Sequence, residues 1–176
     1  MIDKDLEAED KQREFKKLLY GLCFFHAVIN ERRKFGPIGW NKPYEFTFED
    51  LEVCRRQLKV FLGMYEEIDY TVIKVICADI NYGGRVTDKL DKRLISTIIS
   101  SYICSEMLKD TYNMAEALPG DDTYLSPVAG TRSDYIQFIH SLPLNASPEV
   151  FGLHPNAAIT TAQNENRDTL EILINI

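Results

Sequence analysis

One stretch of the sequence, residues 22–41, changes its chemical character twice and so restricts the fold more than any other. It reads LCFFHAVINERRKFGPIGWN. It begins with the apolar side chains of a buried helix, becomes basic at Arg32, Arg33 and Lys34, and ends at Trp40 in a glycine- and proline-containing turn. Proline cannot continue a helix because it lacks the backbone N–H, and glycine favours turns. The stretch therefore predicts a buried helix, a charged helix end and a rigid turn, in that order.

Apolar residues recur at three- and four-residue steps along most of the chain, a spacing typical of amphipathic helices. The pattern predicts helices over residues 6–34, 47–65 and 70–80, another from about residue 87, and two more over residues 135–142 and at the end of the chain. The β-branched side chains of residues 70–80 also suit a strand. A long loop is expected around residues 118–131, which are rich in Pro, Gly, Asp, Ser and Thr. We predict one all-α helical-bundle domain of about six to seven helices.

Several helix starts carry capping residues. Thr47 is followed three residues later by Asp50, a variant of the capping box, and Thr160 is followed in the same way by Gln163. Near residue 87, Asp88 suits the positive end of a helix dipole. These positions predict where three of the helices begin.

The composition is that of an ordinary globular domain. The 176 residues are 45% hydrophobic and 27% charged, and the formal net charge is −7. Nucleic-acid and anionic-membrane surfaces need a basic face, so this charge argues against both and agrees with simple solubility. No apolar run reaches the ~18–20 residues of a membrane span, and the charged residues 1–14 lack the apolar region of a signal peptide. We expect an intracellular protein with no nucleic-acid and no membrane partner.

Four cysteines lie far apart in apolar helical stretches and form no CxxC pair: Cys23, Cys54, Cys77 and Cys104. They are predicted to be buried, reduced thiols rather than disulfides or metal ligands. The three histidines are too widely spaced to predict a metal site. His26 lies on an apolar helical stripe and is predicted to be a hydrogen-bonded core residue.

The motifs of common catalytic sites are absent from the sequence. There is no GxxxxGK[ST], GxGxxG, GxSxG or HExxH, so we predict no catalytic residue and no metal site in this chain. The turn Gly83-Gly84-Arg85 precedes a helix start and is a candidate for binding an anion through free backbone N–H groups. The other interpretation is a flexible turn with a solvated arginine, because Asp88 and Asp91 compete for the same positive helix end.

Arg32, Arg33 and Lys34 are candidates for a docking surface, and Trp40, the only tryptophan, is a candidate interface anchor. Two other interpretations stay open. The cations also suit a solvated helix end, where they match the negative end of the dipole. The tryptophan also suits a turn that closes onto the core of its own domain.

Three blocks of sequence resemble, in the same order, the lid segment near the C-terminal end of the dynein heavy chain motor. They are LLYGLCFFHAVINERRKFGPIGWNKPYEF (residues 18–46), NYGGRVTDKLDKR (residues 81–93) and LPLNASPEVFGLHPNAAIT (residues 142–160). The resemblance covers about residues 12–175 and is closer to axonemal than to cytoplasmic heavy chains. The family often has tryptophan at the position of Leu90, where this chain keeps only the apolar character.

The resemblance implies a non-catalytic helical lid of the sixth AAA module in a ring of six, a module similar to a degenerate, non-hydrolysing one. Such a lid packs against the motor ring and couples it mechanically during ATP-driven movement along microtubules. The implied parent is a microtubule motor ATPase that binds ATP or ADP with Mg²⁺ in other modules, so no cofactor is expected in this chain. Arg32, Arg33, Lys34 and Trp40 become candidate contacts with a neighbouring module.

The resemblance also implies partners and a location. The partners are the neighbouring AAA modules and the C-terminal domain of the same heavy chain, and the parent binds microtubules and dynein intermediate and light chains. The location is the cytoplasmic cytoskeleton, in particular the axoneme of a cilium or flagellum.

The domain boundaries follow from these observations. Residues 1–11 are a charged N-terminal segment, either disordered or the start of the first helix. Residues 12–176 are the lid domain, expected to be truncated because the last helix has no C-cap. Two other functions stay open: a nucleotide-binding regulatory lid that contacts phosphate through the Gly83–Arg85 turn, and a free-standing protein-interaction module.

Overall fold

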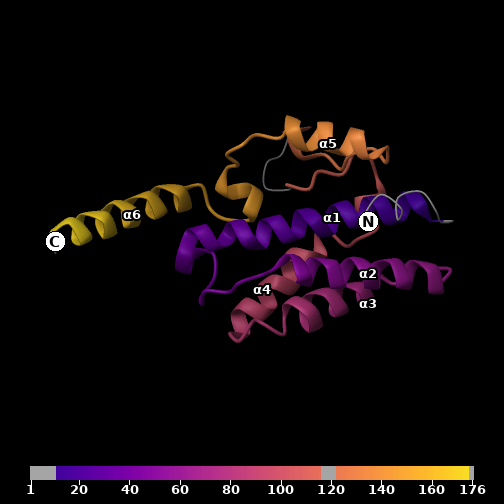
Figure 1. Cartoon of the computed structure of the whole chain (residues 1–176), viewed down its shortest axis with the longest axis horizontal. Helices are drawn as coiled ribbons and strands as arrows, with labels where there is room; N and C mark the ends of the chain where they lie inside the picture. Colours follow the sequence, from indigo (N-terminus) through magenta and orange to yellow (C-terminus); the bar gives the residue numbers. More distant parts are fainter. Residues whose placement is uncertain (1–10, 116–121, 175–176) are drawn as a thin grey trace.

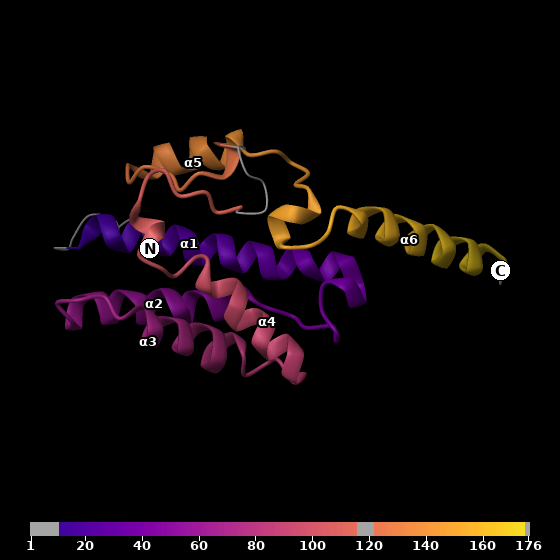
Figure 2. The same ribbon diagram turned by 180° about the vertical axis from the view of Figure 1, so that it is seen from behind.

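Helix α1 (Gln12–Glu31) runs along the middle of the molecule, and the other elements lie on its two sides (Figures 1 and 2). The computed structural model describes residues 11–115 and 122–174. On one side of α1 lie α2 (Phe48–Met64), α3 (Tyr70–Lys74) and α4 (Lys89–Ser100). On the other side lies α5 (Arg132–Ser141) with the irregular segments around it. Helix α6 (Asn156–Ile174) projects beyond the C-terminal end of α1.

The described residues contain helices as their only regular elements. The one β-type pairing among them is an isolated bridge between Asn113 and Leu125. This confirms the prediction of an all-α helical domain. Apart from Lys11, the charged segment predicted at residues 1–11 lies outside the described residues, as does the predicted helix start at residue 6.

Residues 70–80 are helical, which decides between the two structures that their β-branched side chains allowed. Helix α3 continues directly into a π-helix, η3 (Val75–Tyr82). The side chain of Asp69 accepts hydrogen bonds from the N–H groups of Thr71 and Val72, at 3.0 and 3.2 Å. This cap satisfies backbone donors that a helix start leaves free, so it favours the helix over a strand.

Two further helix starts are capped as the sequence predicts. The backbone N–H of Thr47 donates to the Asp50 carboxylate at 2.8 Å, which is one half of a capping box at the start of α2. At the start of α4, the Asp88 carboxylate accepts the N–H groups of Leu90 and Asp91 at 2.8 and 3.1 Å. Short polar side chains thus cap the starts of both α2 and α4.

The predicted start of the last helix at Thr160 is wrong. Helix α6 begins at Asn156, and the Thr160 hydroxyl lies inside the helix and donates to the carbonyl of Asn156 at 3.2 Å. The reason lies upstream, where a 3-10 helix, η6 (Pro148–Phe151), ends at Gly152 in the left-handed conformation with φ of 67°. This sharp stop lets the chain re-enter a helix within a few residues.

The loop predicted at residues 118–131 lies partly outside the described residues. Its described part begins with a 3-10 turn, η5 (Asp122–Tyr124), and pairs with the segment before it. The N–H of Met114 donates to the carbonyl of Tyr124 at 2.8 Å, and the N–H of Ser126 donates to the carbonyl of Tyr112 at 2.7 Å. These bonds hold the segment against residues 112–114 without a regular helix.

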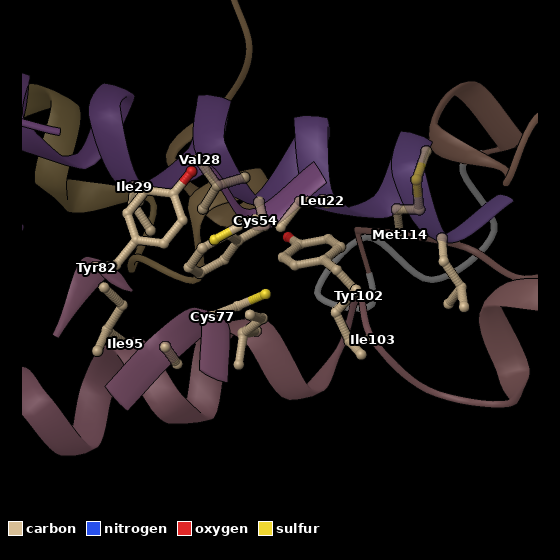
Figure 3. Close-up of a cluster of buried hydrophobic side chains, with 14 of the residues drawn as sticks. Leu22, Val28, Ile29, Cys54, Cys77, Tyr82, Ile95, Tyr102, Ile103 and Met114 are labelled. Atoms are coloured by element: carbon tan, nitrogen blue, oxygen red, sulfur yellow. The ribbon is translucent and has the colours of Figure 1, made fainter. Parts of the chain in front are cut away.

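The face of α1 toward α2, η3 and α4 is aliphatic and aromatic. Figure 3 shows the side chains that meet there: Leu22, Val28 and Ile29 of α1, Cys54 of α2, Cys77 and Tyr82 of η3, and Ile95 of α4. Burial of each large apolar side chain contributes about 1.5–3 kcal/mol to stability. This stripe is the one that the three- and four-residue spacing of the sequence predicts.

The opposite face of α1 is held by polar and aromatic contacts. Lys17 is completely buried, and its ammonium lies 2.6 Å from the Asp110 carboxylate and 3.0 Å from the Ser126 hydroxyl. Tyr20 stacks on Tyr135 of α5 with ring centroids 5.8 Å apart. A buried ammonium is tolerated only when it is paired, so these partners must stay in place around it.

The cysteine prediction is right for two residues and wrong for two. All four thiols are free, and Cys54 and Cys77 are buried next to each other in the core (Figure 3). Cys23 is exposed and Cys104 is half-buried. Cys23 follows Leu22 directly, so it points about 100° away from the buried stripe of α1.

His26 joins α1 to η3, as predicted for a hydrogen-bonded histidine. Its Nδ1 lies 2.9 Å from the hydroxyl of Tyr82, and its Nε2 lies 3.2 Å from the amide nitrogen of Asn30. The amide nitrogen can only donate, so the neutral ring accepts at Nε2 and donates from Nδ1. Burial lowers the pKa of His26, with a smaller opposing effect of Asp50.

We expect His26 to make the stability of the chain depend on pH. The unfolded chain binds a proton near the ordinary His pKa of 6.5, whereas the folded chain binds it only at lower pH. The free energy of unfolding should therefore fall as the pH decreases from 7.5 to 5.5, and His26→Gln should reduce that slope. Urea unfolding across this range measures it. The matched control is His140→Gln at an exposed position of α5; equal slopes for the wild type and His26→Gln would contradict the assignment.

Candidate inter-module surface

The chain turns sharply after α1, and Arg32 holds that turn from the inside. A 3-10 helix, η2 (Arg32–Ile38), follows α1, and Arg32 is only 4% exposed. Its Nε–H donates to the carbonyl of Gly39 at 3.2 Å, and its Nη1 donates to the carbonyl of Phe151 in η6. Burial lowers the pKa of Arg32, although an arginine side chain stays protonated in proteins. Arg32 therefore links two segments that are 119 residues apart.

Trp40 closes the same turn onto the end of α1. Its side chain is 3% exposed, and the indole N–H donates to the carbonyl of Ile29 at 3.1 Å. That carbonyl belongs to the last turn of α1, where carbonyls lack partners within the helix. The ring also packs edge-on against Tyr44, with centroids 5.8 Å apart. Trp40 therefore closes the turn onto the core of its own domain and is not an exposed interface anchor.

Arg33 and Lys34 are the two candidate contacts whose side chains are exposed. Lys34 forms an ion pair with Glu31, at 2.6 Å. The side chain of Arg33 has no hydrogen bond or ion pair with any described residue. Contact of this stretch with another module stays a prediction, and the structure narrows it to Arg33 and Lys34 because Arg32 and Trp40 are buried within this domain.

The Gly83–Arg85 turn uses its backbone donors inside the chain. The N–H of Gly84 donates to the carbonyl of Ile80, that of Arg85 to Tyr82, and that of Val86 to Gly83, all at 3.1–3.2 Å. The turn is also tight, because a Cβ at Gly83 would overlap backbone carbonyl oxygens of η3. The free N–H groups that an anion site requires are therefore engaged here.

The Arg85 side chain is engaged as well. Its Nε–H donates to the Asp50 carboxylate at 2.9 Å, the same carboxylate that caps α2. The bond joins the end of η3 to the start of α2. The Gly-Gly-Arg sequence thus serves the packing of η3 against α2.

The described residues hold neither a candidate metal site nor a membrane-spanning helix. Within residues 11–115 and 122–174, no three His, Cys, Asp or Glu side chains gather where they could hold a metal ion. In the same part of the chain, no helix has the length and apolarity to cross a membrane. The sequence did not predict the hydrogen bond between Arg32 and Phe151, because spacing along the sequence carries no signal for contacts between distant segments. It did not predict Lys42 as a residue of the surface formed by the turn after α1 for the same reason.

The comparisons with known proteins agree with this helical architecture. Residues 15–157 match the family described as the dynein heavy chain AAA lid domain. The chain is 46% identical over 157 residues to dynein axonemal heavy chain 3 of Homo sapiens, a match that covers 89% of this chain and 4% of that protein. It is 48% identical over 172 residues to dynein axonemal heavy chain 1 of Mus musculus, covering 94% of this chain and 4% of that protein. It is 40% identical over 164 residues to dynein axonemal heavy chain 12 of Mus musculus, covering 93% of this chain and 5% of that protein.

The all-α fold and the extent of the family match define the protein class as a helical lid domain of an AAA module. The chain belongs to the dynein heavy chain AAA lid family. This confirms the resemblance carried by the three sequence blocks, and the axonemal relatives agree with the axonemal character predicted from them. The chain spans 4–5% of the length of these relatives.

We expect Trp40→Ala to destabilise the domain by about 3–5 kcal/mol, because it empties a buried site and frees the carbonyl of Ile29. Trp40→Phe should cost less, since it removes the hydrogen bond but keeps an aromatic ring. Urea unfolding measures both. The control is Leu90→Ala, at a position 63% exposed, which should change the free energy of unfolding by no more than about 0.5 kcal/mol. Equal effects at Trp40 and Leu90 would contradict the structural role of the tryptophan.

Proposed function

We propose that this chain is the non-catalytic lid of the sixth AAA module of a dynein heavy chain, which packs against neighbouring modules and couples them mechanically. The observation that carries the proposal is the fixed, basic turn at the end of α1. Arg32 and Trp40 hold the turn rigidly from inside, while Arg33 and Lys34 are exposed on its outer side. A rigid surface attached to a long central helix is suited to transmit rigid-body movement between modules.

The parent protein is, in this proposal, a microtubule motor ATPase of the axoneme in a cilium or flagellum. The printed names of the relatives, all dynein axonemal heavy chains, support this assignment. The proposed partners are the neighbouring AAA modules and the C-terminal domain of the same chain, with microtubules and dynein intermediate and light chains bound by the parent.

We also propose that ATP or ADP with Mg²⁺ is bound by other modules of the parent and not by this chain. The engaged N–H groups of the Gly83–Arg85 turn and the Arg85–Asp50 ion pair support this. We expect no saturable heat when ATP or ADP with Mg²⁺ is titrated calorimetrically into the chain at millimolar concentration. Saturable binding that Arg85→Ala abolishes would instead support the nucleotide-binding regulatory lid.

We expect Arg33→Ala, in a dynein motor that carries this lid, to reduce microtubule gliding velocity and microtubule-stimulated ATPase about fivefold, a usual size for coupling between sites. The side chain of Arg33 is exposed and unpaired within the described chain, so thermal unfolding should not change. Lys109→Ala is the matched control, because Lys109 is exposed and precedes Asp110, which pairs with Arg13 near the opposite end of α1. Full velocity and ATPase in a folded Arg33→Ala motor would refute the coupling role of this turn.

A further inference from the structure

A hollow of about 200 Å³ lies on the outer side of the turn that follows α1. Its walls include Arg33, Pro37, Trp40, Lys42 and Pro43. Pockets for cofactors and drug-sized ligands usually measure about 300–1,000 Å³. The hollow is therefore small for such a ligand and suits one or two side chains of a protein partner. We name it the Arg33–Lys42 pocket.

The pocket is formed before any partner binds. The N–H groups of Gly39 and Trp40 both donate to the carbonyl of Gly36 at 3.0 Å. Two prolines, Pro37 and Pro43, fix their own φ angles in its walls. A partner would lose little free energy to the ordering of the backbone of this turn, because hydrogen bonds and prolines already fix it.

The pocket is positively charged in a chain of net negative charge. Residues 32–44 contain four basic residues and no acidic one, whereas the whole chain carries −7. Two of the four cations are engaged: Arg32 is buried against carbonyl groups, and Lys34 pairs with Glu31. The other two line the pocket, and among the described residues the side chain of Lys42 donates only to the neutral hydroxyl of Thr87, at 3.3 Å.

Two of the nearby carboxylates have other partners. Asp88 accepts the N–H groups at the start of α4 and the side-chain amide of Asn41, at 2.8–3.1 Å. Asp91 is buried and accepts the hydroxyl of Tyr44 at 2.9 Å and the backbone N–H of Asn41 at 3.1 Å. Neither lies within ion-pair distance of Arg33 or Lys42 in the described chain. The pKa of Asp88 is lowered mainly by the backbone N–H of Asp91, and the charge of Lys42 adds a smaller effect from farther away.

Several other exposed arginines of the described chain have a carboxylate partner, although Arg93, in α4, is exposed and likewise has none among the described residues. Arg13 pairs with Asp110 at 3.5 Å, and Arg56 pairs with Glu52 at 3.1 Å. Arg33 has none among the described residues and lies beside an apolar hollow. A guanidinium group holds a carboxylate through two parallel hydrogen bonds, and an ammonium group adds a second charge contact.

We propose that the Arg33–Lys42 pocket docks an acidic segment of another module of the same heavy chain. An Asp or Glu carboxylate of that segment pairs with Arg33 and Lys42, and a neighbouring apolar side chain enters between Pro37 and Pro43. Only the location of the partner rests on the proposed function, whereas its chemistry follows from the charge and size of the pocket.

The test places a photo-crosslinking residue, p-benzoylphenylalanine, at Ile38 in a dynein heavy chain that carries this lid. Ile38 is 40% exposed and follows Pro37 without lining the pocket, so both cations and both prolines stay in place. Mass spectrometry should identify a cross-linked segment of another module with Asp or Glu within a few residues of the link. Arg33→Glu should lower the yield about tenfold, and replacement of that acidic residue by arginine should restore it. Lys109→Glu is the control and should leave the yield unchanged.

Three outcomes would overturn the docking proposal. They are a cross-linked segment without an acidic residue, a yield that Arg33→Glu does not change, and a cross-link confined to this lid or to a different chain. The proposed function fails separately. A cross-link to an acidic segment, together with full velocity and ATPase in Arg33→Ala, would support the docking and refute the coupling. Reduced velocity with a cross-link to a non-acidic segment would refute the docking alone.

Discussion

The buried guanidinium of Arg32 is the interaction on which the C-terminal half of the structure depends. It donates to the carbonyls of Gly39 and Phe151 and lies 5.7 Å from the centroid of the Trp40 ring. Hydrogen bonds to a charged donor are stronger than neutral ones, and loss of the donor would leave buried carbonyls unpaired. Arg32 thereby fixes the turn after α1 and, through η6, the place from which α6 departs (Figure 2). The buried Arg32 therefore fixes the backbone position of the exposed Arg33 and Lys34.

Helix α1 has two faces that are stabilised by different kinds of interaction. Toward α2, η3 and α4 it presents an aliphatic and aromatic stripe, which is stabilised by removal of apolar surface from water (Figure 3). On the opposite face it presents Lys17 and Tyr20, and Arg32 follows at the start of η2. All three are stabilised by specific pairs. The apolar face tolerates changes of shape better than the polar face tolerates changes of partner, because an unpaired buried charge costs several kcal/mol. Such pairs keep the two layers from shifting against each other.

The parts of the fold that were predictable are those that depend on short-range pattern. The all-α class, the apolar stripe of α1 and the caps at Thr47 and Asp88 follow from spacing and local hydrogen bonding, and all are present. The candidate site was less predictable. The basic run was visible, but Arg32 and Arg33 differ in burial although they are neighbours of the same type. Which one turns inward depends on the carbonyl of Phe151, and no local rule connects residues 119 positions apart.

By itself the sequence determined the helices, the family and the chemistry at the surface of the turn, because periodicity, capping and idiosyncratic blocks are local properties. The tertiary structure alone decided which polar residues are interior. It buried Lys17 and Arg32, joined Arg85 to Asp50, and placed Cys54 beside Cys77 across two helices. It also placed Lys42 and Arg33 in the walls of the same pocket. The physical reason is that a charged side chain is interior only where distant segments supply its partners, and those partners are known only once the chain has folded.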